Sequence, residues 1–203
     1  MNTKFILLAL CGLLGACSTP NPPAPPVQVI NLSSGQVWDD MDDVRAAVGA
    51  KAEVTGLTLD LKGADMMGVG EPLKIDIYGF TLKNGAIGNL PLLVTGDNVT
   101  FKNVVFFEPD ITFIEGEAPG MSIVKCKFFL SSTVAVRVKN GRGFSFINSY
   151  LTANLGTGIE ITGGGARIED STFEYLDVAI KGTNLTLKNN TYLGVKLKQT
   201  LLE

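Results

Sequence analysis

The sequence predicts an all-β fold in which one chain coils into a single parallel β-helix. Three observations favour it: a six-residue frame recurs along the chain, short alternating strands accompany the frame, and glycine or asparagine turns connect the strands. Parallel strands in an open sheet need crossover connections of about a dozen residues or more, usually helical. Strands as closely spaced as these can pair only if each turn of the chain stacks on the previous one, as in a solenoid.

The recurring frame can be aligned by eye across most of the chain. It reads VTGLTL, IYGFTL, FKNVVF, IVKCKF, FINSYL, IEDSTF and LKNNTY, and it begins at residues 54, 77, 101, 123, 146, 168 and 187. The intervals are therefore 23, 24, 22, 23, 22 and 19 residues, and we expect about seven short turns. Stacked turns give two inward apolar columns, namely Val54, Ile77, Phe101, Ile123, Phe146, Ile168 and Leu187, and Leu59, Leu82, Phe106, Phe128, Leu151, Phe173 and Tyr192.

The third position of the frame is expected to form a column of turn residues. Its members are Gly56, Gly79, Asn103, Lys125, Asn148, Asp170 and Asn189. Asparagine and aspartate tolerate a left-handed backbone, so we interpret this column as structural rather than as a polar binding stripe. The next position points inward and aligns Cys126 with Phe80, Val104, Ser149 and Ser171. We expect Cys126 to be a buried, small apolar side chain.

A second alternating strand follows the later frames after about a dozen residues. These strands are expected over residues 111–114, 134–138, 158–161 and 178–180. Turns that contain Gly116, Gly141, Gly163 and Gly182 then lead the chain into the next frame.

The pattern of turns over residues 50–198 resembles that of the right-handed, pectate-lyase-like β-helix superfamily, which includes polysaccharide lyases, glycoside hydrolases and phage tailspikes. The resemblance implies a right-handed coil, encoded by a bacterium or by a phage or prophage. It also implies that an enzyme of this type would act on polysaccharides from a groove on the outside of the coil. Its lyases use calcium-holding aspartates and a basic residue, commonly arginine, whereas its hydrolases use two or three nearby carboxylates.

The N-terminal segment has the layout of a secretory signal peptide, with a short basic start and an apolar run too short to span a bilayer. Leu14, Gly15, Ala16, Cys17 and Ser18 resemble the lipobox of bacterial lipoproteins. The resemblance implies that Cys17 is acylated and holds the mature chain on a lipid membrane. In that family a serine after the cysteine, here Ser18, favours the outer membrane. The alternative is an ordinary signal peptide with an incidental cysteine.

Three segments follow from this reading of the N-terminus. Residues 1–16 are the expected signal peptide, residues 17–32 are a lipidated and proline-rich tether, and residues 33–203 are the β-helix domain. A solenoid needs caps on its end turns. An amphipathic helix near residues 37–48 is the expected lid on the first turn. Leu197, Leu201 and Leu202 are expected to close the last turn or to be buried against another chain, as in a homo-oligomer.

Composition excludes several classes of function. The mature chain from Cys17 has 16 basic and 20 acidic side chains, because only Lys4 is lost, so no basic stripe is available for nucleic acid. The sequence contains no histidine, which removes the commonest general base and metal ligand. The acidic cluster over residues 39–43 lacks the ligand spacing of a calcium loop and is typical of a helix start, so we expect neither a metal nor a cofactor.

Catalysis would have to use carboxylates and basic side chains on the outside of the coil. The outward acids are Asp97, Glu108, Asp110, Glu115, Glu117, Glu160, Glu169, Glu174 and Asp177. The best constellation is Arg137 beside Glu160 on successive turns, with Lys181 nearby, and a cross-strand salt bridge explains it equally well. We therefore expect a non-catalytic binding or structural module that displays its β-helix to a glycan or an envelope protein. Polysaccharide lyase or glycoside hydrolase activity is the alternative.

Overall fold

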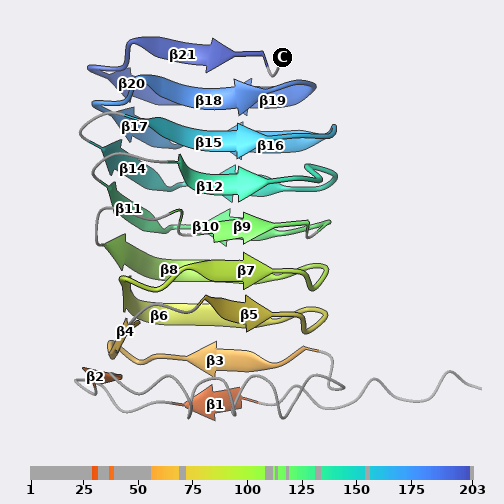
Figure 1. Ribbon diagram of the computed structural model, residues 1–203, viewed down its shortest axis with the longest axis vertical. Coiled ribbons are helices and arrows are strands. Elements are labelled where there is room, and N and C mark those ends of the chain that lie inside the picture. The colour runs from red at the N-terminus through yellow and green to blue at the C-terminus, as the bar shows by residue number, and fades with distance from the viewer. Residues whose placement is uncertain are drawn as a thin grey trace, which may run out of the picture.

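The computed structural model describes residues 29–31, 37–38, 56–68, 72–107, 112, 114–117, 119–130, 134–153 and 156–201. This part of the chain is all-β and forms a parallel β-solenoid of about six turns. Figure 1 shows the turns stacked along the long axis, with the N-terminal strands at one end and β21 at the other. The parallel coil predicted from the frame is confirmed. Within the described residues, no helix is long and apolar enough to cross a bilayer.

Two sheets run along the coil. The 14-stranded sheet consists of β1 (Val29–Asn31), β2 (Val37–Trp38), β3 (Thr58–Asp60), β4 (Asp65–Met67), β6 (Thr81–Gly88), β8 (Thr100–Phe107), β10 (Ser122–Val124), β11 (Lys127–Leu130), β13 (Ser145–Ile147), β14 (Tyr150–Ala153), β16 (Ala166–Glu169), β17 (Thr172–Glu174), β19 (Leu185–Lys188) and β20 (Thr191–Leu193). The 7-stranded sheet consists of β5 (Leu73–Ile75), β7 (Leu92–Val94), β9 (Ile114–Gly116), β12 (Val134–Val138), β15 (Thr157–Ile161), β18 (Val178–Gly182) and β21 (Leu197–Thr200).

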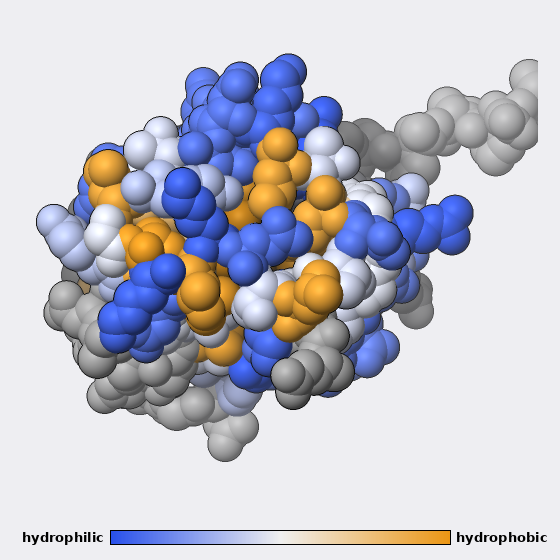
Figure 2. Space-filling model, turned by 90° about the horizontal axis from the view of Figure 1, so that it is seen from above, coloured by the Kyte–Doolittle hydropathy of each residue, from blue (hydrophilic) through white to orange (hydrophobic). Residues whose placement is uncertain are grey.

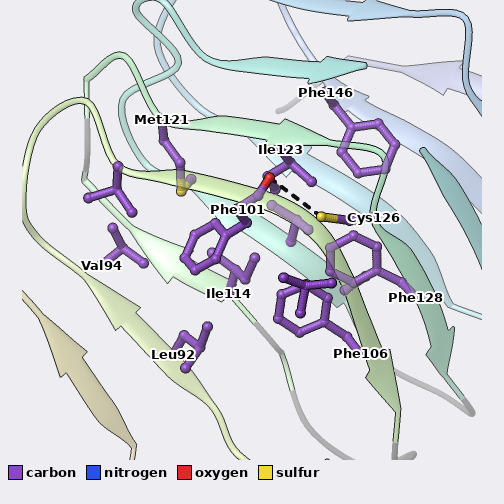
Figure 3. Close-up of a cluster of buried hydrophobic side chains, with 14 of the residues drawn as sticks. Leu92, Val94, Phe101, Phe106, Ile114, Met121, Ile123, Cys126, Phe128 and Phe146 are labelled. Atoms are coloured by element: carbon purple, nitrogen blue, oxygen red, sulfur yellow. Dashed lines mark hydrogen bonds between the residues drawn. The ribbon is translucent and has the colours of Figure 1, made fainter. Parts of the chain in front are cut away.

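The core is a column of side chains that stack from one turn to the next. Phe106 and Phe128 lie face to face, with ring centroids 4.5 Å apart and planes 4° apart. The stack continues through Phe146 and Phe173 to Tyr192. Figure 3 shows three of these rings, Phe106, Phe128 and Phe146, among aliphatic side chains from both sheets. Aromatic pairs of this kind stabilise a core beyond the burial of their area, so each turn is held mainly by its two neighbours.

The register of the first two turns differs from the predicted alignment. From Phe101 onward the inward column is as expected, but the residue one turn before Phe101 is Leu82, and not Ile77. Likewise, Ile87, and not Leu82, lies beside Phe106. The frame that stacks on FKNVVF is therefore LKNGAI, and Ile77 is buried in the turn that precedes β6. IYGFTL and LKNGAI both have apolar residues at their ends and a residue between them that permits a turn, so the sequence pattern alone does not distinguish them.

This shift also corrects the column of turn residues. Asn103, Lys125, Asn148, Asp170 and Asn189 all have positive φ between 50° and 56°, as a left-handed turn requires. The member of this column one turn earlier is Asn84, whose side chain accepts a 3.1 Å hydrogen bond from Asn103 Nδ2. Gly56 and Gly79 also have positive φ, but they lie at a different corner, one above the other.

The expected capping helix lies largely outside the described residues. The two residues of it that are described, Val37–Trp38, form strand β2 and pair with β4, so they are not helical. Strand β1, in the segment expected to be a tether, pairs with β3 and extends the sheet at the N-terminal end. The remaining residues of the helix, 39–48, have no described structure.

A short polar column runs through the otherwise apolar interior. Cys126 is buried, as predicted, and its thiol lies 3.5 Å from the Phe101 carbonyl oxygen (Figure 3). Beside it in the next turns are the buried hydroxyls of Ser149 and Ser171, followed by the side chain of Asn190. Phe80, which the predicted alignment placed in this column, belongs to the other corner of the coil. Burial raises the pKa of the Cys126 thiol to about 12, so it is a neutral packing group at ordinary pH.

Candidate functional site

Arg137, Glu160 and Lys181 are brought together by the 7-stranded sheet. Strands β12, β15 and β18 pair in parallel, and the register places Arg137 beside Glu160 and Glu160 beside Lys181. On β12 the flanking Val136 and Val138 are buried, so Arg137 points outward. The neighbour relationship expected from the sequence is therefore present in the fold.

The charges on this face form an alternating stripe. Arg137 Nε lies 3.5 Å from Glu160 Oε2, and Arg137 Nη1 lies 3.8 Å from Glu115 Oε2 on the preceding turn. Lys139 Nζ lies 3.3 Å from the other oxygen of Glu115. We name Glu115, Arg137, Lys139 and Glu160 the charged stripe. Its side chains are about one fifth to one half exposed, and ion pairs in such positions contribute only about 0–1 kcal/mol.

Glu115 was expected to be an outward acid, but it was not placed beside Arg137, and Lys139 was not singled out at all. The frame of Glu115 was not recognised, because the strand was expected over residues 111–114, whereas β9 is Ile114–Gly116. The signal was present in the alternation itself: Ile114, Glu115 and Gly116 pair with Val136, Arg137 and Val138. Arg137 therefore lies between the carboxylates of Glu115 and Glu160, and its positive charge forms ion pairs with the strands on both sides.

Lys181 lies apart from these ion pairs. Among the described residues no ion pair joins it to Glu160, although the two are adjacent in register. It lines a surface hollow of about 400 Å³ together with Thr157, Val178, Leu197, Thr200 and Leu201. Arg137 and Glu160 do not line this hollow, so the three candidates share a sheet face but not a cavity.

A second surface feature, which sequence reasoning did not single out, lies on the outside of β8, β11 and β14. On each strand the inward ring or leucine alternates with an outward aromatic: Phe106 with Phe107, Phe128 with Phe129, and Leu151 with Tyr150. Phe107 pairs with Phe129 in register, and the rings of Phe129 and Tyr150 have centroids 5.9 Å apart. We name Phe107, Phe129 and Tyr150 the aromatic strip.

The aromatic strip carries a polar partner in Glu174. The Tyr150 hydroxyl donates a 2.5 Å hydrogen bond to Glu174 Oε2. This hydrogen bond raises the pKa of Tyr150 and holds its hydroxyl beside Glu174. Tyr175 follows Glu174 at positive φ, and the ring is packed so closely on Gly194 that a Cβ there would lie 2.8 Å from it. The exposed ring of Phe129 and the partly buried rings of Phe107 and Tyr150 are thus combined with a carboxylate. Lys127, which pairs with Tyr150 in register, is also exposed.

The aromatic strip is unusual because Phe129 remains 42% exposed although it lies on a central strand of the sheet. Single exposed apolar residues are ordinary, but neighbouring aromatic rings with polar groups beside them are typical of interaction surfaces. The sequence contained the signal as pairs of adjacent aromatics, of which one must face outward in a strand.

The remaining predicted site residues lie outside the described structure. Leu14, Gly15, Ala16, Cys17 and Ser18 are in the N-terminal segment, so their assignment stays a prediction. Among the described residues, no three side chains of the His, Cys, Asp and Glu types are grouped as metal ligands. Neither a protein-family model, nor a curated protein, nor a solved structure gives a significant match to this chain.

Proposed function

We propose that this protein is an exported, lipid-anchored binding module that holds a glycan on the aromatic strip and does not transform it. The observation that carries the proposal is the ring pair of Phe129 and Tyr150, with the Tyr150 hydroxyl bound to Glu174. A pyranose ring has apolar C–H faces and hydroxyl edges. Flat aromatic surfaces pack against such faces, and carboxylates accept hydrogen bonds from the hydroxyls.

The geometry of the strip suits an extended chain better than a small molecule. Its aromatic groups come from successive turns, whose strands are separated by about 4.8 Å along the axis of the coil. A polysaccharide that follows the axis can therefore contact several rings in succession. The proposal is supported by the resemblance of the sequence pattern to the right-handed, pectate-lyase-like superfamily, whose enzymes bind polysaccharides on the outside of the coil.

The anchor in this proposal is an acylated Cys17, followed by the proline-rich tether, with the outer membrane as the expected location. It is supported by the lipobox-like residues 14–18. Replacing Cys17→Ala should release the protein from the membranes of the exporting cell. Continued retention on those membranes would contradict lipidation, without affecting the proposal for the aromatic strip.

Glycan binding can be tested with the soluble form that starts at Ser18, by affinity electrophoresis in gels containing neutral or acidic polysaccharides. The variants Phe129→Ala and Tyr150→Ala should each weaken binding at least tenfold, about 1.4 kcal/mol or more. Tyr150→Phe keeps the ring and should retain most of the affinity. The matched control is Tyr78→Ala, because Tyr78 is 55% exposed in the turn before β6 and away from the strip. Equal retardation of wild type, Phe129→Ala and Tyr150→Ala would rule out this surface.

The second candidate, a polysaccharide lyase or glycoside hydrolase, is favoured by one observation, the basic Arg137 between Glu115 and Glu160. To act as a lyase base, the guanidinium would first have to lose a proton, whereas its ion pairs with Glu115 and Glu160 are made by the charged form. We therefore expect no unsaturated and no new reducing ends from any polysaccharide that the module binds. Product formation that is lost in Glu160→Gln but kept in Phe129→Ala would support the enzyme instead.

A further inference from the structure

The last turn of the solenoid presents its interior to the solvent. Leu185 and Leu187 of β19 are half-buried, whereas Ala166 and Ile168, their neighbours one turn earlier, are fully buried. Tyr192 is likewise less buried than Phe173 below it, and Leu197 and Leu201 are 54% and 66% exposed. Figure 2, which looks down on this end, shows apolar residues across the middle of the face with hydrophilic residues around them.

The same turn ends both sheets. Strands β19 and β20 are the terminal strands of the long path through the 14-stranded sheet, and β21 is the terminal strand of the 7-stranded sheet. A terminal strand has one edge without a sheet neighbour, and an extended polypeptide can pair with such an edge through its backbone. Apolar side chains and strand edges are thus presented together at the C-terminal end, which we name the end face, residues 183–201.

The charge of the end face selects among possible occupants. Its charged side chains, among the described residues, are Lys188, Lys196 and Lys198, and none is acidic. Lys196 is neutralised by Asp177 at 2.6 Å, whereas Lys198 lies over the Tyr192 ring at 5.6 Å and has no described ion pair. Lys188 also has no described ion pair. Two copies meeting through this face would bring these lysines together, and like charges across an interface are unfavourable.

A hollow in the end face gives the occupant a place to anchor. It has a volume of about 300 Å³ and is lined by Leu187 and Tyr192 on its apolar side and by Lys188 and Lys198. One apolar side chain can enter it while an acidic neighbour remains beside the lysines. In an extended strand, alternate side chains point to opposite sides, so apolar and acidic residues in alternation fit this arrangement.

We infer that the end face is a docking site for an extended segment of another protein, in which apolar residues alternate with aspartate or glutamate, and which adds a strand to the open end of the coil. The segment covers the exposed interior with its apolar side chains, pairs with a strand edge through its backbone, and places carboxylates beside Lys188 and Lys198. This inference does not depend on the proposed function, because the aromatic strip lies on the side of the coil and contributes no residue to the end face.

The test is a selection of random twelve-residue peptides on the soluble chain that starts at Ser18. The selected pool should be enriched in alternating acidic and apolar residues, and a synthetic peptide from it should shift the amide resonances of β21. Lys188→Glu combined with Lys198→Glu should lower the affinity of the chain for that peptide at least tenfold. The matched control, Lys102→Glu combined with Lys125→Glu, reverses two exposed lysines away from the end face and should leave binding unchanged. A pool without acidic enrichment, or equal loss in both double variants, overturns the inference.

The oligomeric state provides an independent check, measured by sedimentation equilibrium of the same soluble chain. We expect a monomer, because lysines would oppose lysines in a symmetric end-to-end dimer. A dimer that dissociates in Leu197→Glu would show that a second copy covers the face, and it would also overturn the inference.

Discussion

The backbone N–H of Cys126 donates a 3.1 Å hydrogen bond to the hydroxyl oxygen of Ser149, one turn further along the coil. Ser149 N–H in turn donates to Ser171 Oγ at 3.1 Å, and Ser171 N–H donates to Asn190 Oδ1 at 3.0 Å. At this corner, side chains provide the acceptors that a continuous ladder of backbone carbonyls would otherwise supply. Buried backbone N–H groups need such partners.

Replacing Ser149→Ala should lower the free energy of unfolding by about 1–3 kcal/mol, because the buried Cys126 N–H loses its acceptor. Urea unfolding followed by circular dichroism measures the loss. Ser145→Ala is the matched control, because the Ser145 hydroxyl is only partly buried and pairs with Ser122 Oγ. The explanation fails if both variants lose the same small amount.

Two adjacent phenylalanines should respond in opposite ways. Phe128 is fully buried and stacked on Phe106, so Phe128→Ala should cost about 3–5 kcal/mol of stability. Phe129 points outward from the same strand, and Phe129→Ala should change stability by less than about 1 kcal/mol. Thermal unfolding of the two variants provides the comparison. Similar losses in both would show that β11 is not registered as described.

The Cys126 thiol should make the free energy of unfolding depend on pH above 9.0, where the thiol of the unfolded chain ionises. Burial raises its pKa from 9.0 to about 12, so between these values the unfolded chain loses a proton that the folded chain keeps. Unfolded chains bind fewer protons there, and stability falls as pH rises, by about 1.4 kcal/mol per pH unit from this group. Below pH 9 the contribution should be flat.

Other groups also titrate at high pH, so the readout is the difference in slope between wild type and Cys126→Ala. The soluble form that starts at Ser18 is suitable, because Cys126 is then the sole cysteine. Its reaction with a thiol reagent at pH 8 should also be slow until urea unfolds the chain. Identical pH slopes in the two proteins would contradict the burial of the thiol.

The turn residue Asn103 should be replaceable by glycine more readily than by alanine. Its φ of 56° is left-handed, a conformation that costs most L-residues about 1–2 kcal/mol. Asn103→Ala should lose about that amount together with the hydrogen bond to Asn84, whereas Asn103→Gly loses the hydrogen bond but keeps the backbone unstrained. Denaturant midpoints of the two variants measure the difference, and a glycine variant less stable than the alanine variant would contradict it.

Most of the coil could be predicted from the sequence, because the repeated positions are those at which the geometry of each turn requires a particular kind of residue. Large apolar residues such as Phe101, Ile123 and Phe146 recur where side chains stack inward, and asparagine recurs where φ is positive. The register at Leu82 could not be chosen reliably, because IYGFTL and LKNGAI both carry apolar ends and a residue that permits a turn. Only the pairing of β6 with β8 separates them.

The candidate site was less predictable than the fold. Arg137 and Glu160 could be placed side by side because both lie in strands with clear alternation. Glu115 was not placed beside Arg137, because its strand was expected to end at residue 114. The hydrogen bond from Tyr150 to Glu174 joins residues 24 positions apart, whose side-chain orientations no local pattern specifies. The apolar end face was suggested by Leu197 and Leu201, but the exposure of Leu185 and Leu187 depends on the absence of a further turn above them in the described structure.

Because each turn contacts only the turns beside it, the length of the protein is a quantity that changes in fixed steps. Six intervals between stacked strands, each about 4.8 Å, separate the two ends of the 7-stranded sheet by about 29 Å. Insertion of one more repeat would move the end face outward by one such step and replace only the contacts between the two turns that it separates. The coil can therefore become longer or shorter by whole turns during evolution, while the outer surfaces of the remaining turns stay unchanged.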